Sequence, residues 1–100
     1  MDKKANPVTG ILWWNPDQWE KAKQISSDSH IFDNTYQEWK ESAEKSFNEL
    51  RGNGFTVYKI EIDLDELVKW CKDKKIPLNA QARTEFVSNK VKKRHEANYN

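Results

Sequence analysis

The oxygen-bearing side chains that could bind a metal ion follow two apolar segments that are predicted to be strands. Asn15 and Asp17 come directly after the first segment, and Asp63, Asp65 and Glu66 come directly after the second. If the strands pair in parallel, their carboxyl ends lie at one edge of the sheet, where ligands of open α/β sheets bind. Carboxylate and amide oxygens are ligands that Mg²⁺ prefers. The sequence therefore offers a strand-end pocket for a metal-dependent hydrolase, formed by Trp14, Asn15, Asp17, Asp63 and Asp65.

The same oxygen-bearing residues also explain where two helices begin. Asn15 precedes Pro16, and Asp63 precedes a helical apolar repeat with Glu66 at the position that closes a capping box. Asp17 lies in a first helical turn, where the helix dipole stabilises a negative charge. Because each side chain already has a structural role, we favour capping over catalysis. The sequence predicts no catalytic residue, no metal ion and no cofactor.

Positive charge is concentrated in the last third of the chain. The net charge is +1, but residues 1–68 hold eight Lys/Arg against thirteen Asp/Glu (−5), and residues 69–100 hold nine against three (+6). Cations at the end of the last predicted helix could neutralise nucleic-acid phosphates. Yet Arg83, Lys90 and Arg94 fall within the apolar arc of that helix, which favours pairing with glutamates of the acidic helix from residue 36. The candidate nucleic-acid contacts are Lys90, Lys92, Lys93 and Arg94.

One cysteine and two histidines are too few and too scattered for metal or nucleophile chemistry. Cys71 lies on the apolar face of its predicted helix, where cysteine acts as a small hydrophobic side chain. His30 belongs to a polar loop and His95 to the polar C-terminal segment. A structural zinc site needs four ligands at regular spacings, and the chain has no Gly-rich phosphate loop or nucleophile elbow. We therefore expect a protein that is not an enzyme.

The length of 100 residues fits one domain with a modest core. Charged residues make up 33% of the chain, but the 12% of aromatic residues are enough to favour folding over disorder. We expect a flexible N-terminus over 1–6, a globular domain over 7–94 and a frayed tail over 95–100. The single cysteine excludes an internal disulfide, and no apolar run is long enough for a signal peptide or a membrane span. These features predict a cytoplasmic protein without a membrane partner.

Hydrophobic patterns predict the element order β-α-α-β-α-α. Residues 7–14 and 55–62 are rich in β-branched and aromatic side chains, as strands are. Helices are expected over 16–26, after a Thr35–Glu38 capping box, after Asp63 and after Asn79. The predicted fold is a small α/β or α+β domain, with a two-stranded parallel sheet flanked by four helices. Because such a sheet leaves its edges exposed, a homodimer that joins two edges into four strands is a further hypothesis.

The five tryptophans predict both a core and a candidate interaction surface. Trp39 belongs to an apolar helical stripe, and Trp14 can pack on Trp19 across a helix start. Trp13 points to the opposite side of its strand from Trp14, and Trp70 lies at the margin of its helix. Partly exposed aromatic side chains are typical of protein interfaces. The sequence therefore favours a protein partner or a second copy, bound through Trp13 and Trp70.

Four segments carry a resemblance to other proteins: FDNTYQEW at 32–39, EIDLDEL at 61–67, WC at 70–71 and ARTEFV at 82–87. Over roughly residues 11–90 the chain resembles a small family of bacterial proteins that have no assigned activity. The resemblance implies a bacterial cytoplasmic protein and transfers no functional residue. From the residues themselves, a protein-interaction module is the leading hypothesis, a nucleic-acid-binding protein is the alternative, and a metal-dependent hydrolase comes third.

Overall fold

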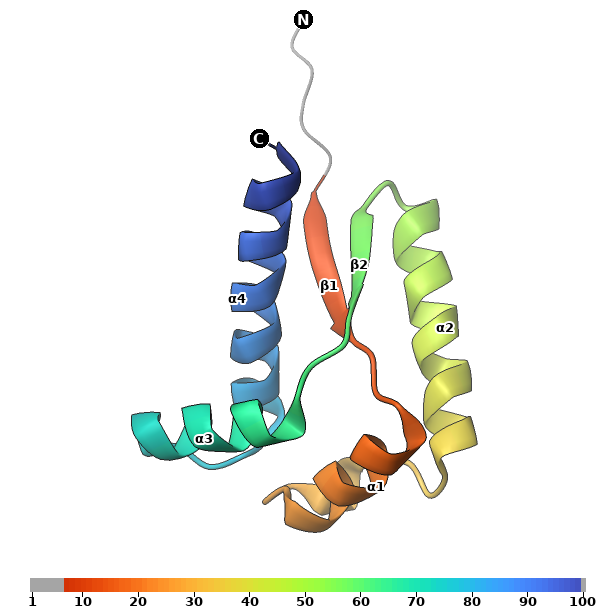
Figure 1. The fold of residues 1–100 in the computed structure, drawn as a ribbon. Coiled ribbons are helices and arrows are strands. Elements are labelled where there is room, and N and C mark those ends of the chain that lie inside the picture. Colours follow the sequence, from red (N-terminus) through yellow and green to blue (C-terminus); the bar gives the residue numbers. More distant parts are fainter. Residues whose placement is uncertain (1–6, 100) are drawn as a thin grey trace, which may run out of the picture.

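The computed structural model describes residues 7–99, which form two strands and four α-helices in the predicted order (Figure 1). The small α+β fold with a two-stranded sheet and four helices is therefore confirmed. A short 3₁₀ turn, η1 (Ser29–Ile31), separates the first two helices. The elements are β1 (Val8–Leu12), α1 (Pro16–Ile25), α2 (Tyr36–Gly52), β2 (Thr56–Ile60), α3 (Leu64–Lys74) and α4 (Ala80–Tyr99).

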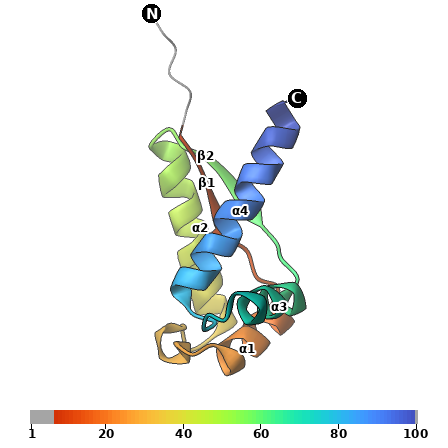
Figure 2. The same ribbon diagram turned by 90° about the vertical axis from the view of Figure 1, so that its left-hand side faces the viewer.

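The two strands pair in parallel, as predicted, in a register that runs from Val8–Thr56 to Leu12–Ile60. Because side chains alternate between the faces of a strand, residues 8, 10 and 12 share one face and residues 9, 11 and 13 share the other. The carboxyl ends of both strands lead towards α1 and α3, which cross that end of the sheet (Figures 1 and 2). The two faces of the sheet are therefore covered by the other two helices, α2 and α4.

The helices α2 and α4 cover opposite faces of the sheet (Figures 1 and 2). On the α4 face, a Cβ atom at Gly10 would collide with Val91, and it would lie 3.2 Å from Ile60 Cγ1. Glycine at this position is therefore what lets α4 approach β1 closely. On the other face, the rings of Trp13 and Trp39 of α2 meet edge-on with centroids 5.5 Å apart. The sheet is thus the middle layer of three.

Capping side chains begin the helices where the sequence predicted. Asn15 Oδ1 accepts the N–H of the third α1 residue at 2.8 Å, and Thr35 and Glu38 form a complete capping box on α2. Asp63 caps α3 by accepting a backbone N–H at 2.9 Å. Such caps satisfy N–H groups that have no partner within the helix. They also fix the direction in which each helix leaves its strand.

The core lies between the sheet, α4 and the two helices at the carboxyl ends of the strands. Trp19 and Leu67 are its most buried large side chains, with 1% and 0% exposure. Helix α4 continues to Tyr99. The main members of the core are Trp14, Trp19, Ala22, Ile60, Ile62, Leu64, Leu67, Cys71, Ala82, Phe86, Val87 and Val91.

Candidate functional site: a groove along the free edge of β1

The strand-end residues lie at one end of the sheet but do not converge on a metal site. Asn15 and Asp63 hold backbone N–H groups as caps, and Asp17 and Asp65 are exposed in the first turns of α1 and α3. Trp14 is 4% exposed, and its carbonyl accepts a hydrogen bond from a tyrosine of α2 at 2.9 Å. Within residues 7–99, no group of three or more His, Cys, Asp or Glu is arranged to hold a metal ion. At this end of the sheet the structure brings together the N-termini of α1 and α3.

The basic side chains of α4 are divided between internal contacts and solvent. Lys90 Nζ lies 3.0 Å from the carboxylate of Glu66 on α3, so Glu66 forms an ion pair with α4 in place of the predicted capping box. Arg94 donates to a carbonyl of β2 at 3.3 Å, whereas Lys92 and Lys93 are exposed. The predicted pairing with glutamates of α2 is wrong, because α2 lies on the opposite face of the sheet. Two of the four candidate nucleic-acid contacts, Lys90 and Arg94, are therefore engaged in contacts within the fold.

Trp13 and Trp70 are both half-buried, but they pack against helices that lie on opposite faces of the sheet. Trp13 packs against Trp39 of α2, and Lys59 Nζ lies 4.3 Å from the centroid of the Trp13 ring. Trp70 packs edge-on against Phe86 of α4 with centroids 5.3 Å apart. The two tryptophans therefore do not form one interaction surface.

A groove with a volume of about 670 Å³ runs along β1 on the side away from β2. Its floor is the strand itself, from Val8 to Leu12. One wall is the side of α4 that carries Thr84 and Ser88, and Trp39 of α2 contributes to the other. We call this feature the edge groove.

The backbone of β1 supplies polar groups to the edge groove. The ladder with β2 begins where the Thr56 N–H donates to the Pro7 carbonyl at 2.8 Å. It ends where the Trp13 N–H donates to the Ile60 carbonyl at 2.8 Å. In a parallel ladder, alternate residues of a strand point both backbone groups at the same neighbour. Odd-numbered residues of β1 therefore bond to β2. The N–H and carbonyl groups of Val8, Gly10 and Leu12 point into the groove.

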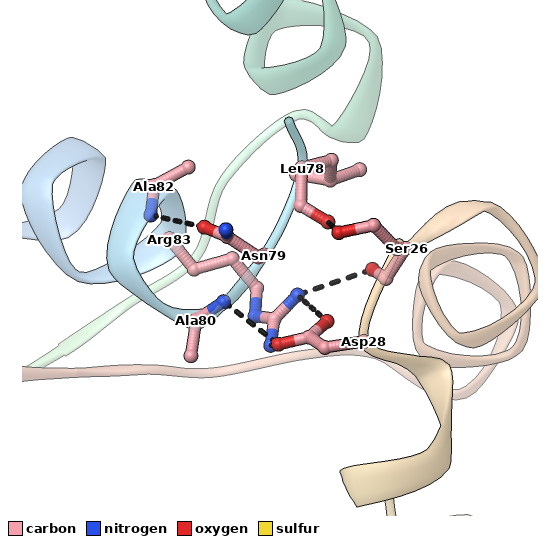
Figure 3. A network of polar contacts seen from close by, with 8 residues as sticks. Ser26, Asp28, Leu78, Asn79, Ala80, Ala82 and Arg83 are labelled. Atoms are coloured by element: carbon pink, nitrogen blue, oxygen red, sulfur yellow. Dashed lines mark hydrogen bonds and ion pairs between the residues drawn. The ribbon is translucent and has the colours of Figure 1, made fainter. Parts of the chain in front are cut away.

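A partly buried ion pair fixes the start of α4 beside one end of the edge groove (Figure 3). Arg83 makes a forked contact with Asp28, through bonds of 2.8 and 3.1 Å, and it also donates to Ser26 Oγ at 3.1 Å. Asp28 accepts the Ala80 N–H at 2.8 Å as well, so one carboxylate joins the loop after α1 to the first turn of α4. The two ion-pair side chains are only 11% and 17% exposed.

Burial and the charge of Arg83 have opposite effects on the pKa values of two groups at this junction. Burial raises the pKa of the Asp28 carboxyl, but the hydrogen bonds and charge of Arg83, together with the Ala80 N–H, outweigh burial and hold the pKa below its ordinary value. Burial also raises the pKa of the nearby Cys71 thiol, and the charge of Arg83 offsets part of that effect. Cys71 is 4% exposed, in agreement with its predicted role as a small core side chain.

The other end of the edge groove is lined by polar residues from the last turns of α4. His95 Nδ1 lies 3.2 Å from Tyr58 Oη of β2, and the two rings meet with centroids 6.3 Å apart. Lys92 and Glu96 line the same end and are exposed. His95 therefore belongs to the packed domain rather than to the polar tail in which the sequence placed it. His30 is exposed in η1.

The edge groove was not found by sequence reasoning, although two signals for it are present. Ala80, Thr84, Ser88 and Lys92 recur every four residues, which places them on one side of a helix. That side adjoins the apolar stripe of the same helix, which includes Val87 and Val91. In addition, the strand β1 contains no charged residue. Neither signal shows which edge of the sheet stays free until the strand order is known.

Comparisons with protein-family models, with curated proteins and with solved structures found no match. Among the helices of the described residues, none combines the length and the apolar composition needed to cross a membrane.

Proposed function

We propose that this protein is a non-enzymatic protein-interaction module that binds an extended polypeptide segment at the free edge of β1. The observation that carries the proposal is the row of backbone N–H and carbonyl groups at Val8, Gly10 and Leu12, which face the edge groove. An added strand would bond to this row as strands do within a sheet. The backbone would provide affinity, and the groove walls would select the side chains.

The two edges of the sheet differ in a way that favours β1 as the binding edge. Edge strands are commonly protected against pairing by charged side chains or by covering groups. On β2, Lys59 carries an exposed charge, and its carbonyl accepts a bond from Arg94. On β1, no residue is charged, and the only nearby proline is Pro7, whose position directs its nitrogen towards β2. The unprotected edge is therefore the one that faces a groove.

The walls of the edge groove indicate what kind of segment it would take. Trp39, Val87 and Val91 provide apolar surface, while Thr84 and Ser88 provide hydroxyl groups. A segment that pairs with β1 alternates its side chains between these two sides of the sheet. We expect β-branched or other apolar residues at alternate positions and no proline at positions that must donate a hydrogen bond.

The other two hypotheses receive less support from the geometry. Nucleic-acid binding would depend on Lys92 and Lys93, because Lys90 and Arg94 are held in contacts within the fold. A hydrolase would need a group of carboxylates, and the described residues arrange none for a metal ion. Trp13 and Trp70 are not part of the proposed binding edge.

A peptide-display experiment tests this function. Random extended peptides would be selected on the immobilised protein at low density, and bound peptides would be compared on the variants Ser88→Arg and Asn89→Arg. Both residues are exposed on α4, but only Ser88 lines the edge groove. We expect enriched peptides with alternating apolar residues that lose at least about tenfold in affinity on Ser88→Arg and none on Asn89→Arg. Peptides that bind both variants equally, or no enrichment, would contradict the proposal.

A further inference from the structure

We infer that the segment bound at the edge groove is β1 of a second copy of this chain, paired antiparallel about a two-fold axis that passes between the two Gly10 residues. The inference rests on the proposed function and names its partner. The product is a homodimer with a continuous four-stranded sheet in the order β2-β1-β1-β2. Each copy would present the same edge, as a two-fold interface requires.

The backbone of β1 has the symmetry that such pairing needs. In an antiparallel pair, opposed residues that exchange both hydrogen bonds alternate with residues that exchange none. If Gly10 faces Gly10 of the second copy, Val8 faces Leu12, and all these residues point their backbone groups outward. Every N–H and carbonyl in the groove between Val8 and Leu12 would then find a partner. A shift of the pairing by one residue would oppose outward groups to groups already bonded to β2.

The side chains of β1 match themselves about the same axis. On the α4 face, apolar Val8 meets apolar Leu12, and Gly10 meets Gly10. On the α2 face, β-branched Thr9 meets β-branched Ile11. Cross-strand pairs of β-branched and apolar side chains stabilise a sheet, and no charges of like sign are opposed. Residues of similar character are therefore opposed along the whole five-residue strand, which makes it well suited to pair with itself.

The groove-facing side of α4 is compatible with a second α4 beside it. Val87 and Val91 contact the position of Gly10, so this part of α4 lies closest to the axis. Small Ser88 lies on the same turn and lines the groove. In the antiparallel arrangement, Lys92 would lie near Thr84 of the second copy, so that a cation meets a hydroxyl group. Helices with small residues at the contact can approach one another closely.

The size of the sheet supplies a reason for the dimer. Sheets most often have about four to six strands, so this two-stranded sheet, packed between α2 and α4, is small. Here the second edge is covered by Arg94 and Lys59, which leaves β1 as the edge through which the sheet can grow. Dimerisation would also remove the exposed template for uncontrolled strand pairing that an unprotected edge presents.

Sedimentation equilibrium of the full chain tests the inference. The chain has a mass of 11.9 kDa, and we expect a concentration-dependent species of twice that mass. Ser88→Arg should raise the dimer dissociation constant at least about tenfold, because it opposes two cations at the axis, and Asn89→Arg should not. Circular dichroism would confirm that both variants fold. A protein that stays at 11.9 kDa at all concentrations, or a dimer equally stable in both variants, would overturn the inference.

Disulfide trapping tests the register independently. Residues 9 and 11 of the two copies would be opposed without hydrogen bonds, where the Cα atoms lie about 4.5 Å apart. A mixture of Thr9→Cys and Ile11→Cys proteins should therefore form the linked dimer faster than either variant alone. Preferential linkage of Thr9→Cys with itself would overturn this pairing. A monomer that still binds displayed peptides would refute only the second copy as partner, whereas loss of peptide binding would refute the proposed function.

Discussion

Removing the charge of Asp28 should destabilise the fold by about 2 kcal/mol, through the junction that joins the loop after α1 to α4. Asp28 accepts two bonds from Arg83 and one from the Ala80 N–H, and the ion pair is less than one-fifth exposed. Hydrogen bonds to charged groups contribute about 1.5–3 kcal/mol each, but Asp28→Asn keeps the shape and some of the bonds. For a domain of this size, that loss lowers Tm by roughly 8–16 °C.

The assay is urea unfolding of a double-mutant cycle with Asp28→Asn and Arg83→Gln, followed by circular dichroism. We expect a coupling free energy of about 2 kcal/mol, because each single variant leaves a charged or polar partner half-buried. The control is Glu85→Gln, which removes the exposed pair with Lys74, where the side chains are 50% and 47% exposed. This control should change the free energy of unfolding by less than about 0.5 kcal/mol. Equal effects of Asp28→Asn and Glu85→Gln would refute the reasoning.

The pH dependence of this effect has a defined sign. The folded state lowers the pKa of Asp28 from its ordinary value of 3.8, so the ionised carboxylate is stabilised by folding. Its contribution is fully present above pH 3.8 and is lost as the pH falls through the lower pKa of the folded state. The difference in unfolding free energy between the natural protein and Asp28→Asn should therefore be constant near neutral pH and shrink in acid. A difference that grows on acidification would contradict the assigned shift.

Three further changes test the packing around the edge groove and the core. Gly10→Ala should destabilise the fold by about 1–3 kcal/mol in urea unfolding, because the new methyl group collides with Val91, and Val91→Ala in the same chain should restore part of the loss; additive losses would contradict this. Tyr36→Phe should cost about 1 kcal/mol, since it removes the 2.9 Å bond to the Trp14 carbonyl between β1 and α1, and a neutral result would show that the bond is not formed in solution. Cys71 should react with a thiol reagent only as fast as the protein unfolds, because burial raises its pKa and limits access; rapid labelling in native buffer would oppose this assignment.

Local signals in the sequence were enough to predict most of the fold. Asn15, Thr35 and Asp63 mark helix starts because a capping bond depends only on neighbours in the chain. The strands followed from runs of β-branched and aromatic residues. In each case the physical cause lies within a few residues of its effect.

Contacts between distant segments could not be predicted in the same way. The bond between Asp28 and Arg83 joins residues 55 positions apart, and nothing near either residue identifies its partner. Glu66 has the correct spacing for a capping box, yet Lys90 of α4 competes for it and forms the ion pair. The edge groove depends on which strand edge remains free and on where α4 crosses the sheet. Those features arise only when the layers assemble.

Amide hydrogen exchange along β1 tests most directly whether this strand edge is the binding surface. The account predicts that Thr9 and Ile11 exchange slowly in both the natural protein and Ser88→Arg, because their N–H groups bond to β2. Val8, Gly10 and Leu12 should be protected at high concentration in the natural protein and exchange at least about tenfold faster in Ser88→Arg. Equal, rapid exchange of these three amides in both proteins at every concentration would contradict the account.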